Sequence, residues 1–215
     1  MSDLVVVDNA ARLRELIGEP GERVRNKVHP RLDADDRQWL EASTLCFLAT
    51  SDAQGRCDSS PKGDPAGSLV HVIDHSAIAI AERPGNRRVD GYLNVLENPH
   101  VGAVFVVPGR SDVLRVNGRA RLVEDAPWFD SLAVDGKRPV LALHIEIEEV
   151  FGHCAKALVR SRLWHPQTWR TGDVTDVSST ARERRAKGLP DLHDGGTSVE
   201  ELEAAQVASY SSPLY

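Results

Sequence analysis

The sequence predicts a mainly β domain with flanking helices, whose strands form a closed or nearly closed barrel. Six or seven short strand-like segments follow one another between residues 44 and 150, with few helices between them. Two of them, residues 113–123 and 140–150, alternate apolar and polar side chains with a period of two, as strands with one buried face do. Helix signals gather mainly at the two ends of the chain.

Two helices are predicted before the barrel. Asn9 is a good N-cap for the first helix, and Gly18 ends it. Residues 19–31 are charged and interrupted by Pro and Gly, which predicts a loop. Asp33 can then cap a second helix that runs to about Ala42.

Hairpins in sequence order are predicted for the barrel. Turn residues at 52–55 join the first two strands, and residues 74–76 join the next two. Residues 61–67, between these hairpins, carry Pro and Gly and predict irregular structure. Short helices are expected near residues 93–96 and 127–133. The predicted strands cover residues 44–50, 56–60, 69–73, 77–81, 101–107, 113–123 and 140–150.

The last third of the chain has a different pattern. Residues 153–164 predict a helix with exposed basic side chains, and residues 171–196 are polar and charged, which predicts a mobile segment. Residues 197–209 predict a terminal helix. The predicted organisation is a helical segment packed on the barrel (1–43), the barrel with a capping helix (44–165) and a C-terminal extension (166–215).

Composition excludes several functional classes. The net charge of −6 argues against a nucleic-acid partner, and an aromatic content of 5% is low for a platform that stacks single-stranded bases. No apolar run approaches the roughly 20 residues of a membrane span, and the N-terminus lacks the basic region of a signal peptide. Three cysteines without a C-x-x-C pair indicate a reducing compartment and no structural zinc. We therefore expect a cytoplasmic protein with no nucleic-acid or membrane partner.

Three arginines cluster where a predicted buried strand gives way to a short helix. These are Arg83, Arg87 and Arg88, in an otherwise acidic chain. Backbone N–H groups at a helix start favour an anion, and the planar fork of arginine matches the oxygens of a phosphate. The cluster therefore predicts an anion site, with a solvated basic loop as the alternative.

Two further stretches carry polar groups suited to a ligand. Residues 58–64 combine small hydroxyls, a glycine and Lys62, and neighbouring hairpins of a barrel would place them at the same rim as the arginines. Lys156 and Arg160 are four residues apart and share a helix face. The histidines form no H-x-x-x-H pair, and neither a serine-hydrolase motif nor a nucleoside-triphosphate loop is present.

Five stretches carry a family resemblance: residues 59–65, 83–90, 98–102, 108–109 and 114–120. In this order and spacing they resemble the pyridoxamine 5′-phosphate oxidase-related family of flavin-binding split barrels, and within it a branch of FMN-dependent enzymes. The resemblance runs from about Ala10 to Trp164.

The resemblance implies a homodimer of split barrels with one FMN at each end of the interface. By resemblance, Arg87 and Arg88 bind the FMN phosphate and Arg83 lies near it. Ser59, Ser60 and Lys62 would lie along the isoalloxazine and ribityl chain, with Ala81 offering its backbone. The segment that contains Lys156, Arg160 and Trp164 would cap the site from the other subunit.

The expected function is that of an FMN-dependent oxidoreductase acting on a small organic substrate. The chain ends without the Trp-Arg-Leu-Pro pattern of the true oxidases, so the resemblance does not imply pyridoxamine phosphate as the substrate. No side chain singles itself out as a general acid or base, although Lys62 could stabilise negative charge on a reduced flavin. Three alternatives stay open: a deazaflavin cofactor, haem with His144 or His153 as axial ligand, and a flavin-binding module without enzymatic activity.

Overall fold

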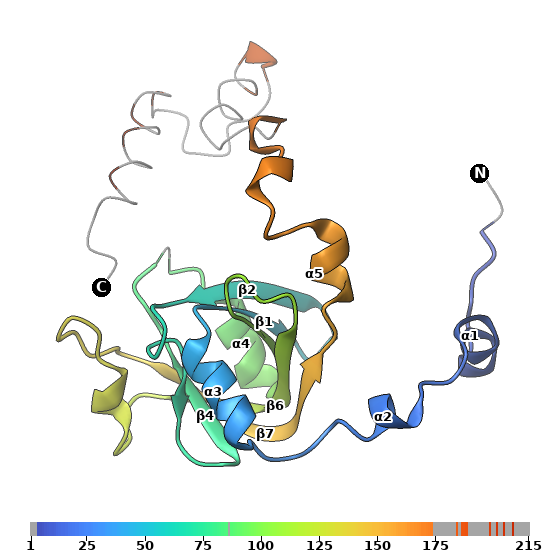
Figure 1. Ribbon diagram of the computed structural model, residues 1–215. Coiled ribbons are helices and arrows are strands. Elements are labelled where there is room, and N and C mark those ends of the chain that lie inside the picture. The colour runs from blue at the N-terminus through green and yellow to red at the C-terminus, as the bar shows by residue number, and fades with distance from the viewer. Residues whose placement is uncertain are drawn as a thin grey trace.

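Seven antiparallel strands form one strongly curved sheet in the order β2-β1-β5-β6-β7-β4-β3 (Figure 1). The computed structural model describes residues 4–85, 87–173, 184, 186–188, 198, 201, 204 and 208. The sheet wraps into a barrel whose edge strands, β2 and β3, do not pair with each other, as expected of a split barrel. The strands are β1 (Leu45–Ser51), β2 (Cys57–Gly63), β3 (His71–Val72), β4 (Ala77–Ala81), β5 (His100–Val106), β6 (Val113–Val123) and β7 (Ala142–His153).

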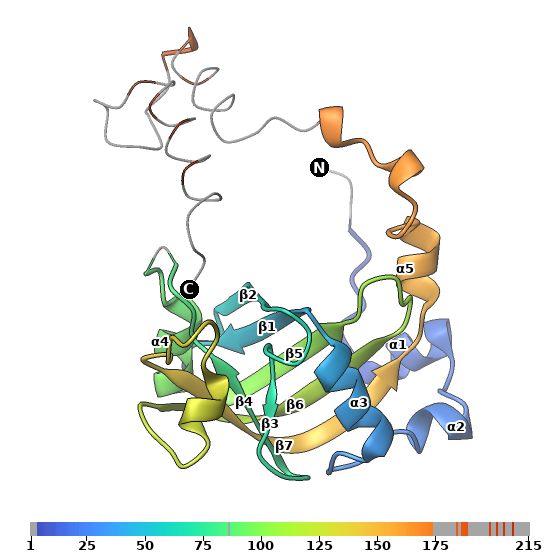
Figure 2. The ribbon, with the colours of Figure 1, turned by 60° about the vertical axis from the view of Figure 1, so that its left-hand side comes forward.

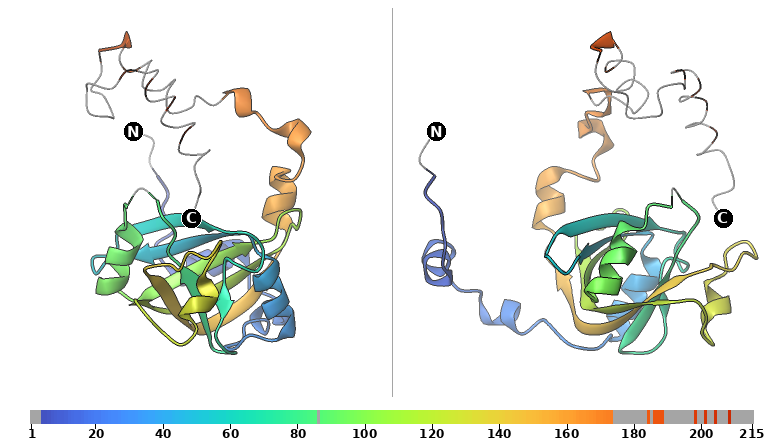
Figure 3. Two further views of the ribbon diagram at one scale, coloured as in Figure 1. Left: turned by 90° about the vertical axis from the view of Figure 1, so that its left-hand side faces the viewer. Right: turned by 180° about the vertical axis from the view of Figure 1, so that it is seen from behind.

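The helices differ in how much they contact the barrel. They are α1 (Ala10–Ile17), α2 (Glu22–Arg25), α3 (Ala34–Ala42), α4 (Asp90–Glu97) and α5 (Lys156–Ser161), with short 3-10 turns at Phe129–Leu132, Pro166–Thr168 and Thr171–Asp173. Helix α4 packs on β1, β2 and β6, and α3 contacts β6. Helix α1 buries none of its residues and lies away from the barrel (Figure 3). The N-terminal segment therefore contacts the barrel through α3 and through His29, which pairs with Val150 of β7.

The core lies inside the curved sheet, and β6 shows how its sequence produces it. Leu114, Val116 and Ala120 alternate along the strand and are buried, as the period of two predicts. The pairing of β6 with β7 shifts register after Asn117, which is a β-bulge. At the bulge, a Cβ on Gly118 would lie 2.0 Å from the backbone oxygen of Glu146, so this position requires glycine.

Several predicted boundaries need correction. Strand β2 continues through Pro61 to Gly63, where the sequence predicted irregular structure; it is an edge strand, and an edge position tolerates the missing N–H of proline. Helix α2 lies in the predicted loop, and the helix expected over residues 153–164 covers only Lys156–Ser161. The turn near Pro127 is a 3-10 helix.

The C-terminal predictions fall largely outside the described residues. This applies to most of the segment 171–196 and of the terminal helix predicted over residues 197–209. Ser198 and Glu201 are described, and they exchange hydrogen bonds: each backbone N–H donates to the side chain of the other. This is the reciprocal arrangement of a capping box.

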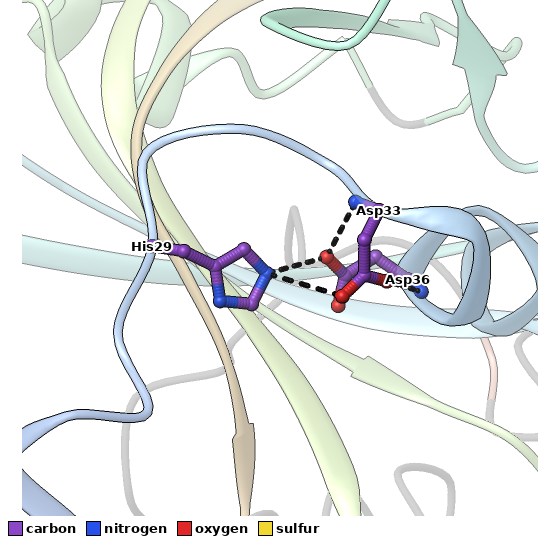
Figure 4. Close-up of side chains that lie close together, drawn as sticks. All are labelled: His29, Asp33 and Asp36. Carbon is purple, nitrogen blue, oxygen red and sulfur yellow. Dashed lines mark hydrogen bonds and ion pairs between the residues drawn. The ribbon is translucent and has the colours of Figure 1, made fainter.

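A cluster of His29, Asp33 and Asp36 fixes the start of α3 to the barrel (Figure 4). His29 exchanges backbone hydrogen bonds with Val150 on β7, and its Nε2 lies 2.7 Å from Asp36 Oδ2. The two aspartates cap α3 reciprocally, so each accepts a backbone N–H of the other. The hydrogen bond to Asp36 raises the pKa of His29. Because the carboxylate oxygens already accept these bonds, we assign the cluster a structural role.

Candidate functional site

The opening of the barrel lies between edge strand β2 and the segment that follows β4. Two ion pairs cross this opening. Lys62 Nζ lies 3.3 Å from Glu82 Oε2, and Arg83 Nε donates to Asp64 Oδ2 at 2.8 Å. The second pair is largely buried, with 15% of the Arg83 side chain and 3% of the Asp64 side chain exposed. The pairs therefore hold the two sides of the opening together.

A pocket of about 440 Å³ occupies this opening. Its walls are β2, the end of β4 with the loop after it, and the first turn of α4. This volume lies within the range of about 300–1,000 Å³ that is usual for small-molecule sites. Six of the predicted site residues line it: Ser60, Lys62, Ala81, Arg83, Arg87 and Arg88.

Ser59 does not line the pocket, although its neighbour Ser60 does. Successive side chains of a strand point to opposite faces, so both serines cannot face the same cavity. The burial of β2 alternates accordingly: Asp58, Ser60 and Lys62 are half-buried, whereas Ser59 is exposed. Within one protomer, Ser59 therefore belongs to the outer face of the sheet.

The predicted capping residues Lys156, Arg160 and Trp164 also lie away from this pocket. They belong to α5 and the turn after it, and the indole Nε1 of Trp164 donates to the backbone oxygen of Arg110 at 2.6 Å. Figure 2 shows α4 and α5 on opposite sides of the barrel. Within one chain these three side chains do not meet the arginine cluster.

Arg87 and Arg88 stand directly before α4. Arg87 has a φ of 62°, in the left-handed region that a non-glycine residue seldom adopts and that is enriched at functional sites. The Arg88 side chain is 78% exposed, and its Nε donates to Asp90 Oδ2 at 2.5 Å, which raises the pKa of the Arg88 guanidinium. Val89, the N-cap, supplies no side-chain acceptor to the helix. The start of α4 thus presents backbone donors and two exposed arginines.

Sequence reasoning missed the polar cluster at the floor of the pocket. The hydroxyl of the buried Tyr92 donates to Glu82, and Lys62 Nζ lies 4.6 Å from the centre of the Tyr92 ring. Burial, and secondly the hydrogen bond to Glu82, raise the pKa of Tyr92, so its hydroxyl remains a donor. The available signals were weak: Glu82 directly follows a buried strand, and Tyr92 shares a helix face with Val95.

The pocket is electrostatically balanced rather than basic. Among the described residues that line it, four are cations and four are carboxylates. The cations are Lys62, Arg83, Arg87 and Arg88, and the carboxylates are Asp58, Asp64, Glu82 and Asp90. Asp58 lies close to the start of α4, since a Cβ on Gly91 would be 3.2 Å from its Oδ2. At the exposed rim, Arg87 and Arg88 supply the cations, and Arg88 is paired there with Asp90.

The two histidines considered as haem ligands lie outside this pocket. His144 is half-buried on β7, with the ring of Trp128 stacked at a centroid distance of 6.3 Å, and burial lowers the pKa of His144. His153 is exposed at the end of β7. The described residues that line the pocket include no histidine, cysteine or methionine.

Comparison with known proteins yields a family match. Residues 32–154 match the profile of the family described as pyridoxamine 5′-phosphate oxidase. Among curated proteins, no sequence matches this chain. Within the described residues, no helix is both long and apolar enough to cross a membrane.

Similar solved structures include three that cover more than half of this chain. A protein of the pyridoxamine 5′-phosphate oxidase class from Lactobacillus delbrueckii is 26% identical, with 57% of this chain and 95% of that chain covered and a TM-score of 0.45. The heme storage protein HutZ from Vibrio cholerae is 18% identical, with 56% and 94% covered and a TM-score of 0.39. An F420 reductase is 17% identical, with 54% and 94% covered and a TM-score of 0.39.

Proposed function

This chain belongs to the pyridoxamine 5′-phosphate oxidase family, and we propose on this basis that it is an FMN-dependent oxidoreductase acting on a small organic substrate. One observation carries the proposal. The pocket at the barrel opening has two exposed arginines, Arg87 and Arg88, beside the first turn of α4. Guanidinium forks and backbone donors at a helix start are together the groups that recognise a phosphate.

The inner part of the pocket suits the ribityl chain and ring of FMN when the phosphate lies at the rim. With the phosphate at the rim, the ribityl chain and ring would extend toward Ser60 and Lys62 on β2 and past the backbone of Ala81. The balanced charge of this inner part fits an uncharged ring system. Arg83 would contribute indirectly, since its guanidinium is engaged by Asp64 and by the backbone oxygen of Leu132.

FMN would supply the hydride and electron chemistry, while the protein binds and orients it. Lys62 would place its positive charge at the inner end of the pocket, where it could stabilise negative charge on the reduced ring. Glu82 holds Lys62 in position, and Tyr92 in turn donates to Glu82. This cluster is therefore proposed to orient Lys62, and no general acid or base is assigned.

Reduction of bound flavin by a nicotinamide donor tests whether the protein is an enzyme. We expect anaerobic NADH or NADPH to bleach the flavin absorbance of the FMN-loaded full chain, and an added electron acceptor to restore it. Free FMN with the same donor serves as the control for uncatalysed reduction. A rate no higher than that of free FMN with either donor would contradict the enzymatic proposal and favour a flavin-binding module.

A deazaflavin is the second candidate cofactor, because it also carries a phosphate after a ribityl chain. Arg87 and Arg88 would meet that phosphate in the same way, so these two residues do not separate the two cofactors. Mass spectrometry of the cofactor released from the purified protein would distinguish them.

A homodimer is proposed because the outer face of the sheet is partly apolar where β2, β1 and β5 lie side by side. Strand pairing aligns Pro61, Phe47 and Val104 in one row across β2, β1 and β5. The side chain of Phe47 is 45% exposed, and the next row contains Ala49 and Gly102, which allow close approach. A twofold interface on this face would be self-complementary. It would also bury Ser59, which lies on this face.

Light scattering tests the dimer. We expect the full chain to give about twice its 23.6 kDa, and Phe47→Asp to shift the mass toward the monomer, because a carboxylate would be buried at the interface. The same substitution at exposed Leu16 on α1 is the control and should leave the mass unchanged. A wild-type monomer that holds FMN would contradict the interface and the capping role of Lys156, Arg160 and Trp164.

A further inference from the structure

Helix α1 carries an apolar face that is exposed to water. Leu13, Leu16 and Ile17 are three and four residues apart, so they share one side of the helix, and Ile17 is 75% exposed. The helix is well delimited, because the Asn9 side chain accepts the backbone N–H of Arg12 at its start and Gly18 ends it. A helix of eight residues is nevertheless marginal in water without tertiary contacts. The sequence therefore builds a helix that requires a partner surface.

The N-terminal arm, residues 4–28, leaves the barrel at the end of β7. His29 pairs with Val150, and Lys27 Nζ donates to the backbone oxygen of Gly152 at 2.8 Å and lies 5.0 Å from the centre of the Phe151 ring. Helix α5 follows the same end of β7. Figure 2 shows α1 and α5 on the side of the barrel opposite α4. The arm and α5 therefore leave the barrel from one place.

Helix α4 has a second apolar face that is exposed. Its inner side buries Tyr92 and Val95 against the barrel, whereas Leu93 and Leu96 are exposed, Leu96 by 70%. Val89, the N-cap, is four residues before Leu93 and extends the same side of the helix. One side of α4 thus completes the core of its own chain, and the other is open to a partner.

A second pocket, of about 500 Å³, adjoins this face of α4. It lies between the segment after β4 and the loop 137–140, which precedes β7. Val89 lines it together with the exposed Val140, and Pro84 and Pro139 add further apolar surface. The exposed face of α4 therefore continues into a concave apolar surface.

The arginines of the second pocket are engaged by carboxylates of their own chain. Arg83 pairs with Asp64, and Arg138 pairs with both Asp125 and Asp130. Their charges are largely compensated, so the pocket offers a partner mainly its aliphatic side chains. An amphipathic helix that places its apolar face in a groove is a recurrent mode of protein recognition. The apolar face of α1 has this character.

The homodimer proposed above brings the two faces together. For Lys156, Arg160 and Trp164 to cap the pocket of the other subunit, the end of β7 must lie near that pocket, of which the first turn of α4 is a wall. The N-terminal arm starts from the same end of β7. The arrangement that carries α5 to the partner's pocket therefore also carries α1 toward the partner's α4.

We propose that the apolar face of α1 docks on the partner protomer, along the exposed side of α4 and into the second pocket beside it. The inference rests on the proposed homodimer. Twofold symmetry makes the contact twice, so each protomer both gives and receives an arm. The sheet face around Phe47 forms the dimer, and the arms fasten it. Loss of the arm contact should therefore leave the mass of the full chain at that of a dimer.

Cross-linking tests the inference. Leu16→Cys and Leu93→Cys would be combined in the full chain, with the exposed native cysteines removed as Cys57→Ser and Cys154→Ser. We expect a short bismaleimide to convert the FMN-loaded protein to a covalent dimer on a denaturing gel, because α1 of one chain meets α4 of the other. Leu16→Cys alone and Leu93→Cys alone, in the same background, are the controls and should not give this product.

A polar substitution shows whether the apolar face makes the contact. Ile17→Asp should abolish the cross-link, since docking would bury a carboxylate, whereas Val24→Asp, at an exposed valine on α2 of the same arm, should leave it intact.

The outcomes separate this inference from the homodimer. A cross-link within one chain, no cross-link in a protein that light scattering shows to be a dimer, or a cross-link that persists in Ile17→Asp would overturn the docking of α1 and leave the homodimer standing. A monomer in light scattering would overturn both. Flavin binding and reduction, measured separately, decide the proposed oxidoreductase function.

Discussion

Arg88→Ala should raise the dissociation constant for FMN by about 10- to 100-fold and leave that for riboflavin nearly unchanged. Arg88 is exposed at the pocket rim beside the start of α4, and riboflavin lacks the phosphate that it is proposed to bind. Loss of a charge-assisted, two-point contact to a phosphate has an effect of this order. Arg88→Lys should recover only part of the affinity, since lysine keeps the charge but not the planar fork. Titration followed by flavin absorbance gives both constants.

Arg110→Ala is a matched control for this variant. Arg110 is also exposed and also pairs with an aspartate two residues further on, Asp112, but it lies outside both pockets. Its removal should leave FMN affinity unchanged. Equal losses for FMN and riboflavin in Arg88→Ala, or no loss for FMN, would mean that the arginine cluster is a solvated basic loop.

Arg83→Ala should lower the free energy of unfolding by about 3–5 kcal/mol, because it breaks a largely buried ion pair and removes the guanidinium beside the buried carboxylate of Asp64. At roughly 2–4 °C per kcal/mol for a chain of this size, the melting temperature should fall by about 6–20 °C. The variant also loses the bond to Leu132 that links the barrel opening to the loop before β7. Thermal unfolding followed by circular dichroism measures the change.

A double substitution separates the ion pair from simple packing. Replacing both partners, as Arg83→Met with Asp64→Leu, should recover much of the lost stability, since neither apolar side chain leaves a buried charge. If Arg83→Ala unfolds within about 1 kcal/mol of wild type, the pair does not hold the opening together. That result would favour a direct role of Arg83 near the FMN phosphate, as the family resemblance implies.

The periodicity of apolar residues predicted the strands whose burial pattern is regular from end to end. The alternation in residues 113–123 gave β6 with its bounds, and the buried run before Glu82 gave β4, because each keeps one burial pattern from end to end. The end of β2 was missed because Pro61 is unfavourable in most strands. Its edge position, which makes the proline acceptable, depends on the order of strands in the sheet and not on local sequence.

The candidate site was predicted in its residue types but not in its pairings. Lys62 and Glu82 are twenty residues apart, and Arg83 and Asp64 nineteen, so their contacts follow only from the closure of the sheet. Ser59 and Ser60 were treated alike, although the pleat of a strand separates them. The second pocket joins the segment after β4 to a loop some fifty residues later, which no local pattern could indicate.

The most direct test of the central claim is titration of the wild-type full chain with FMN and, separately, with riboflavin, followed by absorbance and by quenching of flavin fluorescence. The account predicts binding of FMN at micromolar concentrations or below, and binding of riboflavin at least about 10-fold weaker, because the phosphate is held by Arg87 and Arg88. A protein that binds neither flavin at micromolar concentrations, or binds both equally, would contradict it.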